Sequence, residues 1–213
     1  MIQIDDAGSG SLIGGTFIGA MREETGESYF DIIPIKLYND NYFKKKLYLS
    51  YTSKIVDEAF KILSPEKDEL IKVCQGYMFD DTRKRLSENN YLFVNTKIED
   101  PLQSIIEKSF EEYIISLGLP REFIKFTRYP FHFHRLLRWV YADYNNRIKL
   151  CKTGWKSFQK YGRLKVNTHF DVLYNNNYYC LKCGKRIIES SPVKVITYTS
   201  NMPNVIYLHK FCP

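Results

Sequence analysis

The sequence predicts an α/β protein in which a mixed sheet with flanking helices is followed by a small C-terminal β lobe. Short apolar strands open the chain, and after residue 45 strands alternate with segments whose apolar positions recur at helical spacing. In the last part of the chain, cysteine and histidine pairs gather around short apolar runs. We therefore expect two domains, residues 1–150 and residues 151–213.

The first elements are expected to be strands. Residues 1–4 and 12–21 are apolar and flank a glycine-containing loop, which indicates an antiparallel hairpin. Residues 29–38 predict a third strand, in which Pro34 indicates an edge position or a bulge.

The middle of the chain predicts helices that alternate with strands. Helical spacing of apolar side chains predicts a helix over 45–63, and a charged helix is expected near 78–88. Short runs predict strands at 70–74 and 91–98, and a further helix is expected over 101–117. This order of elements favours a mixed sheet with helices on its faces.

Local signals mark the ends of the helix expected over 101–117. Asp100 is expected as its N-cap, Pro101 as its first helical residue and Gly118 as its stop. A last long helix is expected over 131–148, and residues 149–168 read as irregular and basic.

Composition and charge restrict the function. With 213 residues, 44% of them hydrophobic, the chain can bury a real core. No stretch approaches the roughly 20 apolar residues of a membrane span, and no basic leader precedes the first strand, so we expect a soluble, cytoplasmic protein without a membrane partner.

The charge is divided unevenly along the chain. Residues 1–119 hold 14 Lys and Arg against 20 Asp and Glu, a net −6, whereas residues 120–213 hold 17 against 4, a net +13. Basic and aromatic side chains together favour a nucleic-acid partner, which is RNA, DNA or a hybrid. The alternatives are a merely soluble basic surface, or an adaptor whose acidic and basic halves pack on each other.

Two carboxylates, Asp5 and Asp6, follow the first apolar strand and precede the flexible loop of Gly8, Ser9 and Gly10. Paired carboxylates at the end of an ordered strand favour a divalent cation site. The alternative is that an aspartate makes a local turn bond and that the glycines serve geometry alone.

This opening carries a family resemblance. The element order, with residues 4–10 followed by 12–15, resembles the ribonuclease H-like superfamily, and the loop is similar to the Asp-Glu-Ala-Gly-Arg-Gly opening of type 2 ribonucleases H. The resemblance implies that Asp5 and Asp6 bind Mg²⁺ or Mn²⁺ and that the loop of Gly8, Ser9 and Gly10 approaches a nucleic-acid backbone. Cys74 stands where such a fold places an aspartate at the end of its fourth strand.

Metal-dependent cleavage of a phosphodiester needs more than two carboxylates. Asp57 or Glu58 on the first long helix and Asp143 on a later one are candidate supplements, which makes the chain a possible nuclease. The alternatives are that Asp57 and Glu58 are solvated and that Asp143 pairs with Arg147 one turn away. A catalytically inactive module on the same fold is then the second hypothesis.

The C-terminal segment contains two ligand pairs at the spacing of a zinc site. The four side chains are Cys180, Cys183, His209 and Cys212. Four protein ligands close the coordination sphere, so we expect a structural Zn²⁺. Strands expected at 193–199 and 205–208 make the lobe similar to zinc ribbons or treble clefs; chance clustering of free thiols is the alternative.

A tryptophan-containing turn is the last candidate for nucleic-acid contact. Lys152, Trp155 and Lys156 are expected to meet a phosphate backbone, or else Trp155 is a structural anchor. His132 and His134 are expected to be ordinary or phosphate-contacting, because positions i and i+2 of a helix point apart. The remaining thiols, Cys74 and Cys151, are expected to be core residues.

Overall fold

A computed structural model describes residues 1–125, 131–175 and 177–212. The chain forms two compact units: unit 1 comprises residues 1–10 and 14–113, and unit 2 comprises residues 11–13 and 114–213. The functional division at residue 150 stays a prediction.

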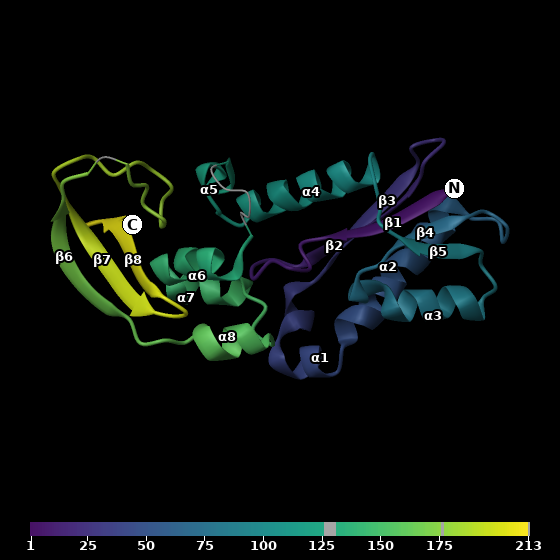
Figure 1. Cartoon of the computed structure of the whole chain (residues 1–213), viewed down its shortest axis with the longest axis horizontal. Helices are drawn as coiled ribbons and strands as arrows, with labels where there is room; N and C mark the ends of the chain where they lie inside the picture. Colours follow the sequence, from purple (N-terminus) through teal and green to yellow (C-terminus); the bar gives the residue numbers. More distant parts are fainter. Residues whose placement is uncertain (126–130, 176, 213) are drawn as a thin grey trace. The chain divides into compact units, whose positions relative to one another are not determined.

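Unit 1 is built on a five-stranded mixed sheet with the order β3-β2-β1-β4-β5 (Figure 1). Strands β1, β2 and β3 are antiparallel, whereas β4 and β5 run parallel to β1. The central strand β1 therefore lies directly beside β4. The strands are β1 (Ile2–Ala7), β2 (Thr16–Arg22), β3 (Ser28–Ile33), β4 (Ile71–Cys74) and β5 (Phe93–Thr96).

The helices of unit 1 follow the expected alternation. They are η1 (Ile35–Tyr38), α1 (Asp40–Lys44), α2 (Leu47–Leu63), η2 (Tyr77–Phe79), α3 (Asp80–Glu88) and α4 (Leu102–Ser116), the last continuing into unit 2. The strand expected over 29–38 was too long. It ends at Ile33, because Pro34 has no N–H for the ladder and instead begins the 3-10 turn η1.

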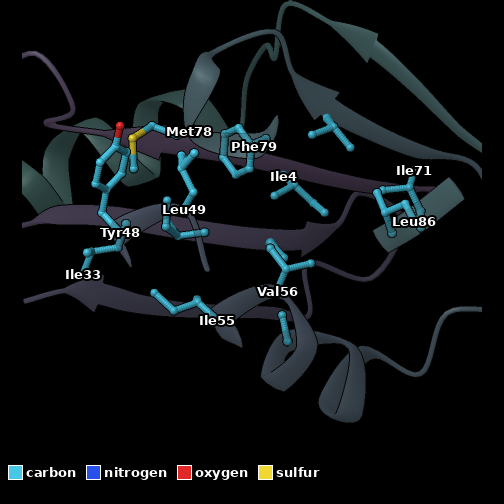
Figure 2. Close-up of a cluster of buried hydrophobic side chains, with 14 of the residues drawn as sticks. Ile4, Ile33, Tyr48, Leu49, Ile55, Val56, Ile71, Met78, Phe79 and Leu86 are labelled. Carbon is cyan, nitrogen blue, oxygen red and sulfur yellow. The ribbon is translucent and has the colours of Figure 1, made fainter. Parts of the chain in front are cut away.

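Helix α2 covers one face of the sheet. Its buried side chains Ile55 and Val56 pack in one cluster with Ile4, Ile71 and Phe79 (Figure 2). Strand residues at alternate positions share a face, so the apolar alternation of β1 supplies this core. Burial of such side chains stabilises the fold by about 1.5–3 kcal/mol each.

Helix α4 covers the opposite face. Its Leu102 packs with Met21 and Ile98 in a second cluster, whereas Ala20, the neighbour of Met21, belongs to the α2 cluster. Because successive strand residues point to opposite faces, α4 and α2 lie on different sides of the sheet. A carboxylate oxygen of Asp100 accepts a hydrogen bond from the Ser104 N–H at 3.1 Å, which caps the first turn although the helix begins one residue later than expected.

Unit 2 combines short helices with an antiparallel sheet of order β6-β7-β8. The elements are α5 (Arg121–Lys125), α6 (Phe133–Ala142), α7 (Tyr144–Arg147), η3 (Ile148–Leu150), α8 (Lys156–Tyr161), β6 (Asn167–Leu173), β7 (Ser191–Thr199) and β8 (Pro203–His209). The two C-terminal strands match the expected ones closely. No helix within the described ranges has both the length and the apolar character needed to span a bilayer.

Two expectations for this unit were wrong. The helix expected over 131–148 is interrupted at Asp143, whose φ of −151° and ψ of 63° are not helical. The Asp143 carboxylate accepts hydrogen bonds from the side-chain amide of Asn146, and such local bonds compete with helix continuation. The segment expected to be irregular contains helix α8, in which Phe158 is buried.

Candidate functional site

The carboxylates Asp5 and Asp6 lie within β1, near its carboxyl end, because the strand continues past the expected residues 1–4 to Ala7. The register pairs Ile4 of β1 with Val73 of β4, so the next residues along the two parallel strands, Asp5 and Cys74, are neighbours. One ligand atom from each of Asp5, Asp6 and Cys74 lies within 4.8 Å of the others. The sheet thus brings two hard oxygen ligands and one thiol to a single point.

The Asp5 carboxylate is buried and hydrogen-bonded. The Asp6 N–H donates to Asp5 Oδ1 at 2.8 Å, and the Cys74 thiol also donates to this carboxylate. Burial raises the pKa of Asp5, the two hydrogen bonds lower it, and the negative charge of Glu107 raises it again; the net direction is upward. A buried carboxylate whose pKa is raised in this way is stabilised in its charged form when a cation binds beside it.

Glu107 of α4 is the carboxylate that sequence reasoning missed. It follows Ile106, which is fully buried in the apolar stripe of α4, and it is exposed itself. The sequence offered one signal for Glu107: it directly follows Ile106, an apolar position of the predicted helix stripe, and so lies beside the face that packs on the sheet. Its negative charge raises the pKa of Asp5, although Glu107 does not belong to the group formed by Asp5, Asp6 and Cys74.

Burial raises the pKa of the Cys74 thiol to about 12, and its hydrogen bond to Asp5 acts in the same direction. At neutral pH, Cys74 is therefore a neutral donor. Neutral thiols are poor ligands for hard cations such as Mg²⁺.

The other sequence-predicted carboxylates lie elsewhere. Glu58 is exposed and pairs with Lys61, with 2.6 Å between Oε1 and Nζ, and Asp57 pairs with Arg85. Neither belongs to the group formed by Asp5, Asp6 and Cys74. Asp143 belongs to unit 2, so its catalytic role stays a prediction.

The first glycine of the loop after β1, Gly8, is required by the local structure. Gly8 has a φ of +86°, and a Cβ placed on it would lie 2.1 Å from a ring carbon of Phe110. Gly10 is exposed, and a Cβ there would meet nothing within 4 Å. Close approach to a ligand stays a prediction for Gly8, Ser9 and Gly10, with Gly10 being the most open of the three.

The C-terminal cysteines and histidine form a compact group that can hold a metal ion. Cys180 Sγ lies 3.6 Å from Cys212 Sγ, and Cys183 Sγ lies 3.4 Å from His209 Nδ1. One ligand atom from each of the four side chains lies within 4.8 Å of all the others. No disulfide links them in the structure.

Local backbone geometry presents these ligands. The turn from Cys180 closes through hydrogen bonds from the Gly184 N–H to the Cys180 carbonyl and from the Cys180 N–H to the Lys185 carbonyl. Gly184 has a φ of +76°, which a glycine adopts without strain. His209 Nε2 lies 3.1 Å from the Arg186 carbonyl, a contact that leaves Nδ1 facing the group.

The electrostatics of this group favour a bound thiolate. Burial alone would raise the pKa of Cys180, but hydrogen bonds from the backbone N–H groups of Cys183, His209 and Lys182 lower it to about 7. Burial and the neighbouring sulfurs raise the pKa of Cys212 to about 12. Thiols that crowd each other in this way lose their protons together when a cation binds between them.

The tryptophan-containing turn differs from the expectation at one position. Lys152 is completely buried, so it is not presented at the surface, whereas Trp155 is half-buried and Lys156 is exposed. Cys151 is buried, as expected, and pairs with Ile13 in an isolated bridge. Contact of Trp155 and Lys156 with phosphates stays a prediction.

The two neighbouring histidines lie at the start of α6, with ring centroids 5.9 Å apart. Burial lowers the pKa of His134, and the charge of His132 acts in the same direction. Neither belongs to a cluster of potential metal ligands in the described ranges.

No protein-family model matches the chain, and no curated protein matches it. The function is therefore inferred from the geometry of the Asp5 group and of the C-terminal cysteine and histidine group.

Proposed function

We propose that this chain is a nucleic-acid-binding protein whose unit 1 is a ribonuclease H-like, divalent-metal-dependent nuclease domain. One observation carries the proposal: the carboxylates of Asp5 and Asp6 converge at the carboxyl end of the central strand. The acidic residues on the first strand match the placement that the sequence resemblance implies, whereas Cys74 stands at the fourth-strand position.

Carboxylate oxygens suit Mg²⁺ or Mn²⁺. Asp5 and Asp6 would hold the cation from β1, and Glu107 of α4, which lies outside their group, would add negative charge nearby. When bound, such ions activate a water and stabilise the leaving oxygen of a phosphodiester. Asp5 is oriented for this role by the Asp6 N–H, which occupies one lone pair of Oδ1.

We propose that the C-terminal group holds a structural Zn²⁺ in a zinc-ribbon-like lobe. Three sulfurs and one imidazole nitrogen are the usual donor set of closed, tetrahedral zinc sites. With all four positions supplied by protein, no position remains for a substrate. The basic segment from residue 120, with net charge +13, supports nucleic acid as the partner.

A second candidate is a nucleic-acid-binding module without chemistry. Cys74 favours it, because a neutral thiol replaces a carboxylate at the end of β4. The two candidate functions differ in whether the protein cleaves nucleic acid, and both require that it binds nucleic acid.

Cleavage of labelled RNA, DNA and hybrid duplexes with Mg²⁺ or Mn²⁺ tests the proposal. Asp5→Asn and Asp6→Asn are expected to lower the cleavage rate at least about 100-fold, because each removes a charged ligand. Glu66→Gln is the matched control, since Glu66 is exposed and lies outside the acidic group. Absence of cleavage in the wild type, with binding retained, would favour the second candidate.

Cys74→Asp separates the candidates further. A nuclease short of one ligand is expected to cleave faster with this carboxylate, whereas a pure binding module is expected to gain nothing. The salt dependence of binding tests the partner class: log affinity that falls steeply with log salt indicates phosphate contacts, and its absence favours the adaptor alternative.

A further inference from the structure

Unit 2 contains a cavity of about 380 Å³ that the proposed zinc and nuclease roles do not use. Residues from α5, α6, β8 and the turn at Cys180 line it. Its volume falls within the range of about 300–1,000 Å³ that is typical of small-ligand pockets.

Two arginines supply positive charge to this cavity. Arg135 and Arg138 both line it and lie one turn apart on α6, so they share a face of the helix. Burial lowers the pKa of Arg135, and the charge of Arg138 lowers it further. Within the described ranges, neither guanidinium forms a salt bridge, although Glu122 also lines the cavity.

The guanidiniums are held in place with donors to spare. Arg138 Nη2 donates to the Val205 carbonyl at 2.9 Å, and its buried Nε has no hydrogen-bond partner. Arg135 donates to the Phe123 carbonyl and lies over the ring of Phe123, with Cζ 4.4 Å from the centroid. An unpartnered, buried charged donor beside a second cation is costly unless an anion binds there.

Tyrosine rings form another part of the wall. Tyr178, Tyr179 and Tyr207 line the cavity, and the rings of Tyr178 and Tyr207 meet edge to face with 4.8 Å between centroids. Tyr178 and Tyr179 are 38% and 45% exposed, so aromatic surface is open to a ligand. Aromatic rings of this kind stack with nucleobases, whatever the base.

We propose that this cavity binds one nucleotide of a single-stranded nucleic acid, with a phosphate on Arg135 and Arg138 and the base against the tyrosines. The proposal rests on the proposed function, because it names the part of the nucleic acid that unit 2 recognises. A paired base inside a duplex cannot enter a concave pocket of this size, so the ligand is an unpaired nucleotide.

The proposed metal site supports one wall of this cavity. Cys180 and Gly184 line it, and Tyr178 and Tyr179 directly precede the first ligand. Removal of the metal is therefore expected to loosen the tyrosine wall and weaken nucleotide binding.

Fluorescence anisotropy with a labelled oligothymidylate hexanucleotide tests the proposal on the full chain with its metal. Arg135→Gln and Tyr178→Leu are each expected to weaken binding at least 10-fold. Each contact between an arginine and a phosphate contributes about −0.7 to the slope of log affinity against log salt. Arg135→Gln is therefore also expected to make this slope shallower by about 0.7. Arg163→Gln is the matched control: it removes an equal charge from an exposed position outside the cavity, and less than a 2-fold change is expected.

Arg138→Lys separates a loss of ligand contact from a loss of folding, because Arg138 also donates a hydrogen bond to the Val205 carbonyl. It keeps the charge, and it is expected to weaken binding while the melting temperature and metal content stay near those of the wild type. If the cavity variants bind as the Arg163→Gln control does, the cavity assignment is overturned and the proposed function stands. If the wild type binds neither the oligothymidylate nor an RNA hexanucleotide, both are overturned.

A competition experiment distinguishes a nucleotide within a strand from a free nucleotide. Unlabelled hexanucleotide is expected to displace the labelled strand at least 10-fold more effectively than thymidine monophosphate, since neighbouring phosphates add contacts. Equal competition by the mononucleotide would overturn the strand assignment in favour of a free nucleotide.

Discussion

The guanidinium of Arg147 lies over the indole ring of Trp139, with Cζ 3.9 Å from the ring centroid. The same guanidinium donates to the carbonyls of Trp139, Leu181 and Lys182 at 2.6–2.8 Å. Burial lowers the pKa of Arg147 to about 10, so it remains charged at neutral pH. One side chain thus joins helix α7 to the turn between Cys180 and Cys183.

Replacement of Arg147 by alanine is expected to destabilise unit 2 and to weaken metal binding. Loss of the guanidinium leaves buried carbonyls without donors, which costs about 3 kcal/mol. Chemical denaturation and competition with a metal chelator measure the two effects. Lys149→Ala removes an equal charge from an exposed position and is expected to change neither the stability of unit 2 nor its metal binding. Equal stability of the two variants would contradict the stabilising role of Arg147.

The metal content depends on four named side chains. The purified protein is expected to contain one Zn²⁺ per chain, and Cys180→Ser or Cys183→Ser is expected to lower this content severalfold and to lower the melting temperature. Elemental analysis and thermal unfolding check this. Cys151→Ala, which removes a thiol outside the group, is expected to retain the metal, and loss of zinc in that variant would count against the assignment.

The loop after β1 distinguishes a structural glycine from an open one. Gly8→Ala is expected to lower the free energy of unfolding by at least about 2 kcal/mol, because its φ is positive and the Phe110 ring occupies the site of the new methyl group. Gly10→Ala is the matched control and is expected to be nearly neutral. Urea denaturation of both variants makes the comparison, and similar values would refute the packing account.

Acid is expected to weaken unit 1 through Glu69. Two hydrogen bonds from Arg22, each 2.9 Å, lower the pKa of Glu69 to about 2 from 4.5. A carboxylate with a lowered pKa contributes stability that is complete above about pH 4.5 and is lost as the pH falls toward about 2.

Glu69→Gln is therefore expected to flatten the dependence of the free energy of unfolding on pH in that window, as measured by urea denaturation at several pH values. Glu66→Gln, an exposed neighbour, is expected to keep the wild-type profile. An unchanged slope in Glu69→Gln would assign acid sensitivity to other groups.

Much of unit 1 could be predicted because its elements carry local signals. The apolar stripe of α2 follows from helical periodicity and matches the structure closely, whereas β1 was expected at the right place but extends further, to Ala7. The break at Asp143 could not be predicted, since a strong apolar stripe continues past it in the sequence while a side-chain bond from Asn146 competes locally. The end of β3 at Ile33 likewise depends on which residues pair with β2.

The sequence alone determined that the chain is α/β and that its C-terminal thiols and histidine have metal-ligand spacing, because both are written in periodicity and in residue type. Only the tertiary structure decided that Glu107 acts on Asp5, that Lys152 is buried and that Arg147 holds the cysteine turn. Those relationships join residues far apart in the chain. Strand register and helix packing set them, and no local pattern encodes either.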